Sequence, residues 1–298
     1  MTSPDPRDEV VISCSNVVKR FDGRTVLSGI NLEVRRGETM VIMGGSGSGK
    51  STILRLMIGS FAPDEGDIRM FGRSVLGLKP EERDELRKRF GILFQSGALF
   101  NSMSLYENVA LPIREHTDLD AAIIDIQVKI KLELVGLLEH ADKYPSQISG
   151  GMKKRAGLAR ALALDPEILF YDEPSAGLDP VTSAQIDQLI VDLSRKLGVT
   201  SVVVTHEMDS AFTIADRMAM LDRGRMIMVE AREWYDRLRK VPESDRGGLS
   251  APELLIRQFL RGDAEGPITA RKDQSQLERA LLGPMTVSSM PSLTPTRT

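Results

Sequence analysis

A short apolar run followed by a glycine-rich loop constrains the fold of this chain more than any other segment. The run 39–43 predicts a buried strand, and apolar residues at helical spacing over 51–58 predict a helix. Between them, Gly44-Gly45-Ser46-Gly47-Ser48-Gly49-Lys50-Ser51 matches the pattern G-x-x-x-x-G-K-[ST] without a mismatch. Amides of such a loop wrap phosphates, the lysine reaches their outer oxygens and the serine hydroxyl reaches Mg²⁺. A strand, a phosphate-binding loop and a helix in this order predict an α/β fold.

Further elements extend the same pattern along the chain. Strands are expected at 10–14, 26–34, 90–94, 168–171 and 202–204, with a β pair over 217–229. Helices are expected at 151–164 and 180–197, and a mainly helical insertion at 105–138, where Ile123, Ile126, Ile130, Leu134 and Leu137 repeat at helical spacing. Strands that alternate with helices predict a parallel sheet with helices on its faces.

A second anion-binding segment lies about a hundred residues after the first. Ser149-Gly150-Gly151-Met152 begins a basic helix that continues as Lys153-Lys154-Arg155. Glycines allow close backbone approach, and the helix N-terminus carries a partial positive charge that favours anions. One nucleotide does not need two such segments from one chain. We therefore expect the second segment to serve a nucleotide that is held by another copy of the protein.

Polar residues at the ends of three predicted strands are the candidates for catalysis. Asp172 and Glu173 end one strand, and they suit a hold on Mg²⁺ and the polarisation of an attacking water, respectively. Gln95 could contact Mg²⁺ or that water, and His206 could hydrogen-bond a γ-phosphate. Each type also occurs at strand ends for reasons of solvation or local structure alone. Phe21 could stack on adenine, with a core aromatic as the alternative.

Composition excludes several classes of protein. Cys14 is the only cysteine, which excludes an internal disulfide framework. The net charge of −3 gives no electrostatic case for nucleic acid. No run approaches the roughly 18 apolar residues of a membrane span, and the N-terminus lacks the apolar region of a secretory signal. A function at a membrane would need a partner that supplies the membrane part.

The chain divides into four predicted segments. Residues 1–9 are expected to be flexible, 10–240 to form the catalytic domain with a helical subdomain at about 96–165, and 283–298, rich in Ser, Thr and Pro, to be disordered. The remaining segment, 241–282, is a C-terminal extension, and a short amphipathic helix is expected in it at 254–260. A further short charged helix is expected at 233–240.

These motifs, in this order over about residues 10–230, resemble the ATP-binding cassette (ABC) family. Gly44–Thr52 resembles its Walker A loop, Gln95 its Q-loop, 148–152 its signature, 168–173 its Walker B segment, Asp179 its D-loop aspartate and His206 its switch histidine. The signature departs from the family's pattern at Ile148 (usually Leu) and Met152 (usually Gln). Neither change removes Ser149 or the glycine amides, so we expect activity to survive.

The resemblance implies a fold, ligands and a dimer. The fold would be a P-loop NTPase of the ABC type, with a mixed sheet core, an antiparallel β subdomain, an inserted helical subdomain and a short C-terminal helical extension. ATP would bind Phe21, Gly44, Gly45, Ser46, Gly47, Ser48, Gly49, Lys50, Ser51 and Thr52; Mg²⁺ would bind Ser51, Gln95 and Asp172; Glu173, His206 and Gln95 would be catalytic. In a head-to-tail dimer, Lys50 of one copy and Ser149 of the other would close on one ATP.

Three other segments resemble the Mla-type lipid-transport ATPases associated with MCE-domain proteins. They are 94–100 with 104–109, 149–155 with its Met152, and 256–262 in the extension. This likeness implies an ATPase that moves phospholipids between inner and outer membranes. Its partners would be two permease subunits and an MCE-domain protein. A small STAS-like regulatory subunit could also belong to the complex. The chain would lie at the cytoplasmic face of the inner membrane, and its extension would contact the partner ATPase, with packing of Phe259 and Leu260 within its own chain as the alternative.

Other functions remain as alternatives. The same ATPase mechanism could drive transport of sterols or other hydrophobic compounds. A soluble ABC ATPase of translation or DNA repair is disfavoured, because the chain has a single Walker A loop and the insertion lacks sustained heptads. A non-catalytic module is disfavoured because Lys50, Asp172, Glu173 and His206 are all present.

Overall fold

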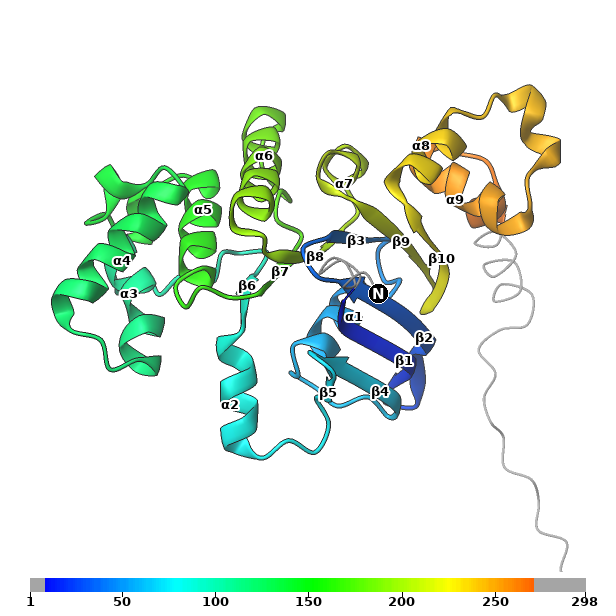
Figure 1. Cartoon of the computed structure of the whole chain (residues 1–298). Coiled ribbons are helices and arrows are strands. Elements are labelled where there is room, and N and C mark those ends of the chain that lie inside the picture. Colours follow the sequence, from blue (N-terminus) through cyan, green and yellow to red (C-terminus); the bar gives the residue numbers. More distant parts are fainter. Residues whose placement is uncertain (1–8, 271–298) are drawn as a thin grey trace, which may run out of the picture. The chain divides into compact units, whose positions relative to one another are not determined.

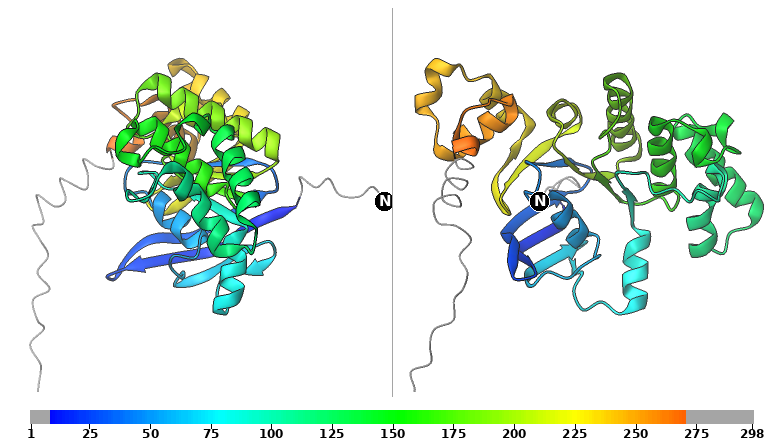
Figure 2. Two further views of the ribbon diagram at one scale, coloured as in Figure 1. Left: turned by 90° about the vertical axis from the view of Figure 1, so that its left-hand side faces the viewer. Right: turned by 180° about the vertical axis from the view of Figure 1, so that it is seen from behind.

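A computed structural model describes residues 9–270 of the chain. Within this range the chain forms two compact units, the first ending at Lys240 and the second beginning at Val241 (Figure 1, Figure 2). The predicted flexible N-terminal segment, except for Glu9, and the predicted disordered tail 283–298 lie outside the described residues, as does 271–282 of the extension. No helix in the described range is long and apolar enough to cross a membrane.

The first unit contains a six-stranded sheet in the order β10-β9-β3-β8-β7-β6. Its strands are β3 (Thr39–Met43), β6 (Phe90–Leu93), β7 (Ile168–Asp172), β8 (Thr200–Thr205), β9 (Arg217–Asp222) and β10 (Arg225–Ala231). The strands from β9 to β6 are parallel, and β10 pairs antiparallel with β9 at the edge. Every residue of β3 and β8 is buried, as expected for central strands covered on both faces. The carboxyl ends of β3, β7 and β8 therefore meet at one edge of this sheet.

A separate antiparallel sheet has the order β2-β1-β4-β5. Its strands are β1 (Val10–Phe21), β2 (Arg24–Arg35), β4 (Glu65–Met70) and β5 (Arg73–Ser74). The β1–β2 hairpin turns at Asp22 and Gly23, whose φ angles of 49° and 75° are those that a two-residue turn between twisted strands requires. The mixed core sheet and the antiparallel sheet are both as predicted, although β1 and β2 are longer than expected and β4 and β5 were not predicted.

One apolar core joins the two sheets through helix α1 (Lys50–Met57). It includes Ile12 and Ile30 from the small sheet, Ile53 from α1, and Phe170 and Val202 from the large sheet. All five side chains are fully buried. Because α1 follows the glycine-rich loop directly, this packing fixes the loop relative to the carboxyl edge of the large sheet.

The predicted helical insertion lies between β6 and β7. It consists of α3 (Leu105–His116), α4 (Ala121–Leu134), the 3₁₀ turns η2 (Leu138–His140) and η3 (Pro145–Gln147), and α5 (Gly150–Ala161). Figure 1 shows α3, α4 and α5 together beyond the β6 edge of the large sheet. The insertion is thus a layer of its own, joined to the sheet mainly through α5, which packs against β6.

Helix α4 is present as predicted, but a different face of it is buried. Ile123, Ile126 and Ile130, which indicate the helix in the sequence, are 43%, 57% and 51% exposed. The buried apolar residues are instead Ile124, Val128 and Leu132, spaced four residues apart. Both faces of this helix are apolar, so periodicity identifies the helix but not the side that packs.

The remaining helices of the first unit are α2 (Pro80–Lys88), α6 (Pro180–Leu197), α7 (Met208–Ile214) and α8 (Arg232–Lys240). Helices α6 and α8 confirm the predictions for 180–197 and 233–240. Helix α2 was not predicted, because Leu86 is its only strongly apolar residue and none of its residues is buried. The sequence features that favour this helix lie at its two ends. Pro80 occupies the first position, and the basic residues Arg87 and Lys88 lie in the last turn.

The second unit contains the 3₁₀ helix η4 (Glu243–Gly248) and helix α9 (Ala251–Arg261). Ser250 and Glu253 form a capping box at the start of α9, and Gly262 ends it with a φ of 68°. Leu255 and Leu260 are buried already in the single chain, and Phe259 is half-buried. Contact of this extension with a partner subunit stays a prediction.

Candidate functional site

The glycine-rich loop joins the carboxyl end of β3 to α1, and two of its glycines have no room for a side chain. A Cβ at Gly44 would lie 2.1 Å from the Leu221 carbonyl oxygen, and one at Gly49 would lie 2.6 Å from Leu27 Cδ2. Gly49 also has a φ of 108°, a conformation that only glycine adopts readily. The tight course of the loop therefore depends on these residues being glycine.

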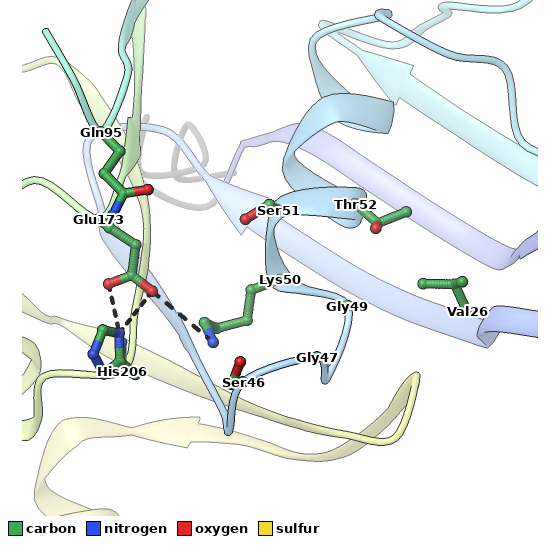
Figure 3. Close-up of a pocket in the computed structure, with 10 residues that line it drawn as sticks. All are labelled: Val26, Ser46, Gly47, Gly49, Lys50, Ser51, Thr52, Gln95, Glu173 and His206. Carbon is green, nitrogen blue, oxygen red and sulfur yellow. Dashed lines mark hydrogen bonds and ion pairs between the residues drawn. The ribbon is translucent and has the colours of Figure 1, made fainter. Parts of the chain in front are cut away.

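A pocket of about 430 Å³ opens at the carboxyl edge of the large sheet (Figure 3). It is lined by Val26, Ser46, Gly47, Gly49, Lys50, Ser51, Thr52, Gln95, Glu173 and His206. Three of these side chains, Gln95, Glu173 and His206, come from the ends of β6, β7 and β8, far from the loop in sequence. The pocket thus combines a phosphate-binding loop with the predicted catalytic side chains.

Lys50 is held at the bottom of this pocket. Its ammonium donates hydrogen bonds to the carbonyls of Gly44 (2.8 Å) and Gly45 (3.1 Å), and lies 4.0 Å from Glu173 Oε1. The side chain is only 8% exposed, and this burial lowers the pKa of the ammonium. A buried cation of this kind interacts strongly with an anion in the pocket, because water screens it little.

Ser51 and Asp172 bring two oxygen ligands together. The Ser51 hydroxyl donates to Asp172 Oδ1 at 3.3 Å. Asp172 is the last residue of β7, and burial raises the pKa of its carboxyl. A hydroxyl and a partly buried carboxylate beside a phosphate-binding loop are a donor set that suits Mg²⁺.

Glu173 has an unusual backbone conformation. Its φ is 51°, a left-handed value that is strained for a residue with a side chain and costs on the order of 1–3 kcal/mol. Its N–H donates to the Val204 carbonyl on the neighbouring strand at 2.9 Å. Its carboxylate accepts a hydrogen bond from the His206 backbone N–H (3.3 Å) and lies 2.9 Å from His206 Nδ1. This conformation directs the carboxylate towards His206 and Lys50, as Figure 3 shows.

The second anion-binding segment lies apart from this pocket. Ser149 is the N-cap of α5, and its hydroxyl accepts the Met152 N–H at 3.3 Å. No residue from 149 to 152 is among the described residues that line the pocket. A Cβ at Gly151 would instead lie 2.4 Å from Thr182 Cγ2, in the first turn of α6, which Asp179 caps. The structure thus places the signature segment against the helix that Asp179 caps, and neither the segment nor Asp179 lines the pocket at the phosphate loop.

Similarity to known proteins identifies the family. The sequence matches the family model described as "ABC transporter" over residues 27–176. It is 42% identical over 277 residues to the "Probable ribonucleotide transport ATP-binding protein mkl" of Mycobacterium leprae, covering 92% of this chain and 76% of that protein. The chain belongs to the ABC transporter family.

Two further matches to this ABC protein are informative. It is 40% identical to the "Intermembrane phospholipid transport system ATP-binding protein MlaF" of Haemophilus influenzae, over 87% of this chain and 93% of that protein. Its fold matches a dimeric post-hydrolysis state of the ATP-binding cassette MJ0796 bound to ADP and Pi. The TM-score is 0.68 at 31% identity, with 74% of this chain and 98% of that chain covered. These matches confirm the predicted fold class and an ATP-hydrolysing enzyme.

Some predicted ATP-binding residues of the ABC protein do not line the pocket. Gly44, Gly45 and Ser48 lie in the loop but not on the pocket wall. Phe21 is 39% exposed at the end of β1, where it packs edge-on against Phe61 with ring centroids 5.6 Å apart. It is not a core residue, and its exposed ring leaves adenine stacking as a prediction.

Two residues at this site are not distinguished in the sequence. Val26, in β2, lines the pocket, but nothing distinguishes it from other strand residues in the sequence. Lys154 donates a hydrogen bond from its ammonium to the Glu173 carbonyl at 2.9 Å and is 5% exposed. In the sequence it is one of three consecutive basic residues, which ordinarily indicate a solvated helix face.

Proposed function

We propose that this ABC ATPase drives the movement of phospholipids between the inner and outer membranes, together with a permease and an MCE-domain protein. The cargo is supported by the 40% identity to the protein named MlaF in Haemophilus influenzae, which extends over nearly the whole of that protein. ATP hydrolysis is supported by the pocket in which Lys50, Glu173 and His206 face one another. The proposed ATPase activity depends on this grouping of side chains.

Each group that lines the pocket has a separate role in ATP hydrolysis. The loop amides and Lys50 bind and orient the phosphates, and Thr52 on the pocket wall adds a hydroxyl. The Glu173 carboxylate accepts a proton from the attacking water. His206, bonded to that carboxylate at 2.9 Å, orients it and offers its ring to the γ-phosphate. Gln95 lies on the same side of the pocket as Glu173, opposite the phosphate loop, and positions the water through its amide.

Ser51, Asp172 and Gln95 would hold Mg²⁺. Magnesium takes oxygen ligands and is commonly held by one or two carboxylates together with substrate phosphates. The hydroxyl of Ser51 and the carboxylate of Asp172 already lie within 3.3 Å of each other. When bound, the ion would neutralise charge on the phosphate oxygens.

A second copy of the chain would complete each site in a head-to-tail dimer. The signature residues Ser149, Gly150, Gly151 and Met152 would contact the γ-phosphate that the partner's loop holds, and Asp179 would lie at the same interface. Ser149 and Gly150 are exposed, which leaves the helix N-terminus accessible to such an anion. The two-fold arrangement gives two equivalent composite sites.

The dimer would work at the cytoplasmic face of the inner membrane. There it would bind two permease subunits, whose movement follows closure and reopening of the ATPase dimer. The MCE-domain protein would receive or deliver the lipid, and a small STAS-like subunit would regulate the complex. Each of these partners is proposed from the resemblance to Mla-type ATPases.

A ribonucleotide is a second candidate cargo, because another relative carries a name that refers to ribonucleotide transport. The relative named "Probable ribonucleotide transport ATP-binding protein mkl" is 42% identical over 92% of this chain, so a polar cargo is the main competitor. Lipid and ribonucleotide transport differ in a measurable way. We would purify the ATPase with its permease from membranes, identify co-purifying molecules by mass spectrometry, and reconstitute the complex in vesicles that contain fluorescent phospholipid.

ATP-dependent loss of labelled phospholipid to an acceptor, absent in the Glu173→Gln complex, is the expected result. Enrichment of ribonucleotides other than ATP and ADP, and ATPase stimulation by them without movement of lipid, would contradict a phospholipid cargo and support the second one. Movement of sterols but not of phospholipids would contradict it as well.

A further inference from the structure

Lys154 is a buried lysine that does not line the nucleotide pocket. It lies five residues after Ser149 on α5, and its side chain is 5% exposed. Burial lowers the pKa of its ammonium, although Glu173, Glu207 and Asp172 oppose this effect through their charges. Taking an ammonium out of water is unfavourable unless it is paired and hydrogen-bonded. A lysine in this position therefore needs a specific partner.

The partner is the backbone of Glu173. The Lys154 ammonium donates to the Glu173 carbonyl oxygen at 2.9 Å, and the Ala176 N–H donates to the same oxygen at 3.3 Å. On the other side of the residue, the Glu173 N–H is bonded to Val204. Hydrogen bonds thus hold both peptide groups that flank the left-handed φ of Glu173. A conformation of this kind persists only where the surroundings hold it in place.

The bond also joins two motifs. Helix α5 begins at the signature segment, whereas Glu173 directly follows β7 and provides the carboxylate of the pocket. Among residues 9–270, Lys154 is the one side chain that bonds the Glu173 carbonyl.

We propose that Lys154 is a positioning residue, which holds the backbone of Glu173 so that its carboxylate faces the attacking water, and which links that carboxylate to the signature helix of the same chain. The inference rests on the proposed role of Glu173 in hydrolysis. In the dimer, a γ-phosphate bound at Ser149 of one copy is then linked through α5 to the carboxylate of that copy's own site.

The test compares variants at Lys154 with matched variants beside it. Lys154→Met keeps the length and apolar stem of the side chain but removes the donor, and Lys154→Gln removes the charge and shortens the reach. Lys154→Arg retains a charged donor. The matched control is Lys153→Met on the same helix; the Lys153 ammonium makes no hydrogen bond or ion pair within the described residues. ATP turnover, KM for ATP and nucleotide affinity are measured on the purified full-length protein.

For Lys154→Met and Lys154→Gln we expect kcat to fall about 10- to 100-fold, because small displacements of a catalytic group have effects of this size. The KM and affinity for ATP should stay within about twofold of wild type, because the phosphate loop is not touched. Lys154→Arg should recover most of the lost kcat, and Lys153→Met should behave as wild type. A kcat within twofold of wild type for Lys154→Met, or an equal loss of nucleotide affinity, would overturn the proposal.

A double-mutant cycle separates positioning from general structural support. If Lys154 acts through the Glu173 carboxylate, adding Lys154→Met to Glu173→Gln should not lower the residual turnover further. Additive losses would indicate a structural role and overturn the inference. Wild-type turnover in Glu173→Gln alone would instead overturn the proposed function of Glu173, so the two failures are distinguishable.

Discussion

The phosphate loop and the signature segment both place glycines at the start of a helix, yet their surroundings differ. In the phosphate loop, Lys50 is 8% exposed and lies 4.0 Å from Glu173, so the loop shares a pocket with the carboxylate that we propose as the general base. No residue of the signature segment 149–152 lines that pocket, and Ser149 and Gly150 are exposed. Within residues 9–270, the first segment lies in one pocket with Glu173 and His206, whereas the second segment has an accessible helix N-terminus and does not line that pocket.

We propose that this difference reflects separate roles, in which each segment binds a different nucleotide of a dimer. The helix N-terminus of α5 offers partial positive charge and the Ser149 hydroxyl, which already accepts the Met152 N–H and can donate its own proton elsewhere. A γ-phosphate from a second copy would supply the anion. Substitutions in each segment should therefore have separable effects on nucleotide binding and on turnover.

Glu173→Gln should abolish most turnover but leave binding intact. Removing a general base typically costs about 10²- to 10⁴-fold in rate, whereas the phosphate loop is unchanged. We expect ATP affinity close to wild type, slow hydrolysis and an accumulated ATP-bound dimer, measured by phosphate release and size-exclusion chromatography. Glu207→Gln, a neighbouring carboxylate outside the pocket lining, is the control and should hydrolyse ATP normally. Wild-type turnover in Glu173→Gln would refute the assigned base.

Lys50→Ala should weaken nucleotide binding itself. The buried ammonium is placed to bond phosphate oxygens, and loss of a charge-assisted hydrogen bond of about 3 kcal/mol would lower affinity on the order of 100-fold. Binding is measured by titration with a fluorescent ATP analogue. Lys196→Ala, at an exposed lysine of α6, should bind as wild type. Unchanged affinity in Lys50→Ala would argue against a phosphate-binding loop.

Ser149→Asp should impair turnover with little effect on the monomer. Aspartate is a good N-cap and keeps the bond to the Met152 N–H, but it adds a negative charge opposite the partner's γ-phosphate. We expect kcat to fall about tenfold and ATP binding to the isolated subunit to be unchanged. Ser149→Asn, a neutral cap of the same shape, should lose much less. Equal losses in both variants would show that the charge is not the cause.

Deletion of residues 251–298 should weaken pairing of the ATPase subunits by a few-fold. The deletion removes α9 and the chain after it, which we predict to contact the partner subunit. Dimer formation with ATP is measured by size-exclusion chromatography on the Glu173→Gln background. Deletion of 283–298 alone is the control. A dimer that is unaltered by the larger deletion would refute the prediction for the extension.

The sequence predicts the phosphate loop and the strand ends well for a physical reason. A backbone carbonyl close to Gly44 and the φ of 108° at Gly49 both favour glycine, so the loop is visible as a pattern of residue types. Helix α2 is not visible in this way, because its charged residues remain exposed and give no apolar period. The buried face of α4 depends on its neighbours, since both of its faces are apolar.

The role of Lys154 is invisible for a related reason. A lysine within a basic run usually extends into solvent. Only the fold, in which α5 packs against β6, the neighbour of β7, brings its ammonium to the Glu173 carbonyl. The left-handed φ of Glu173 is likewise a consequence of tertiary contacts, because nothing in the local sequence requires it. Residue types therefore predict which groups react, whereas the contacts that hold them in position need the folded chain.

If the signature segment serves the nucleotide of a second copy, two variants that are each defective should complement one another when they are mixed. Lys50→Ala and Ser149→Asp are each expected to form impaired dimers, with both composite sites affected. In a mixed dimer the two defects fall in one site and leave the other intact. Random exchange makes half of the dimers mixed, so turnover should recover to about a quarter of wild type. Turnover that stays at the mean of the two separate variants would contradict a site shared between copies.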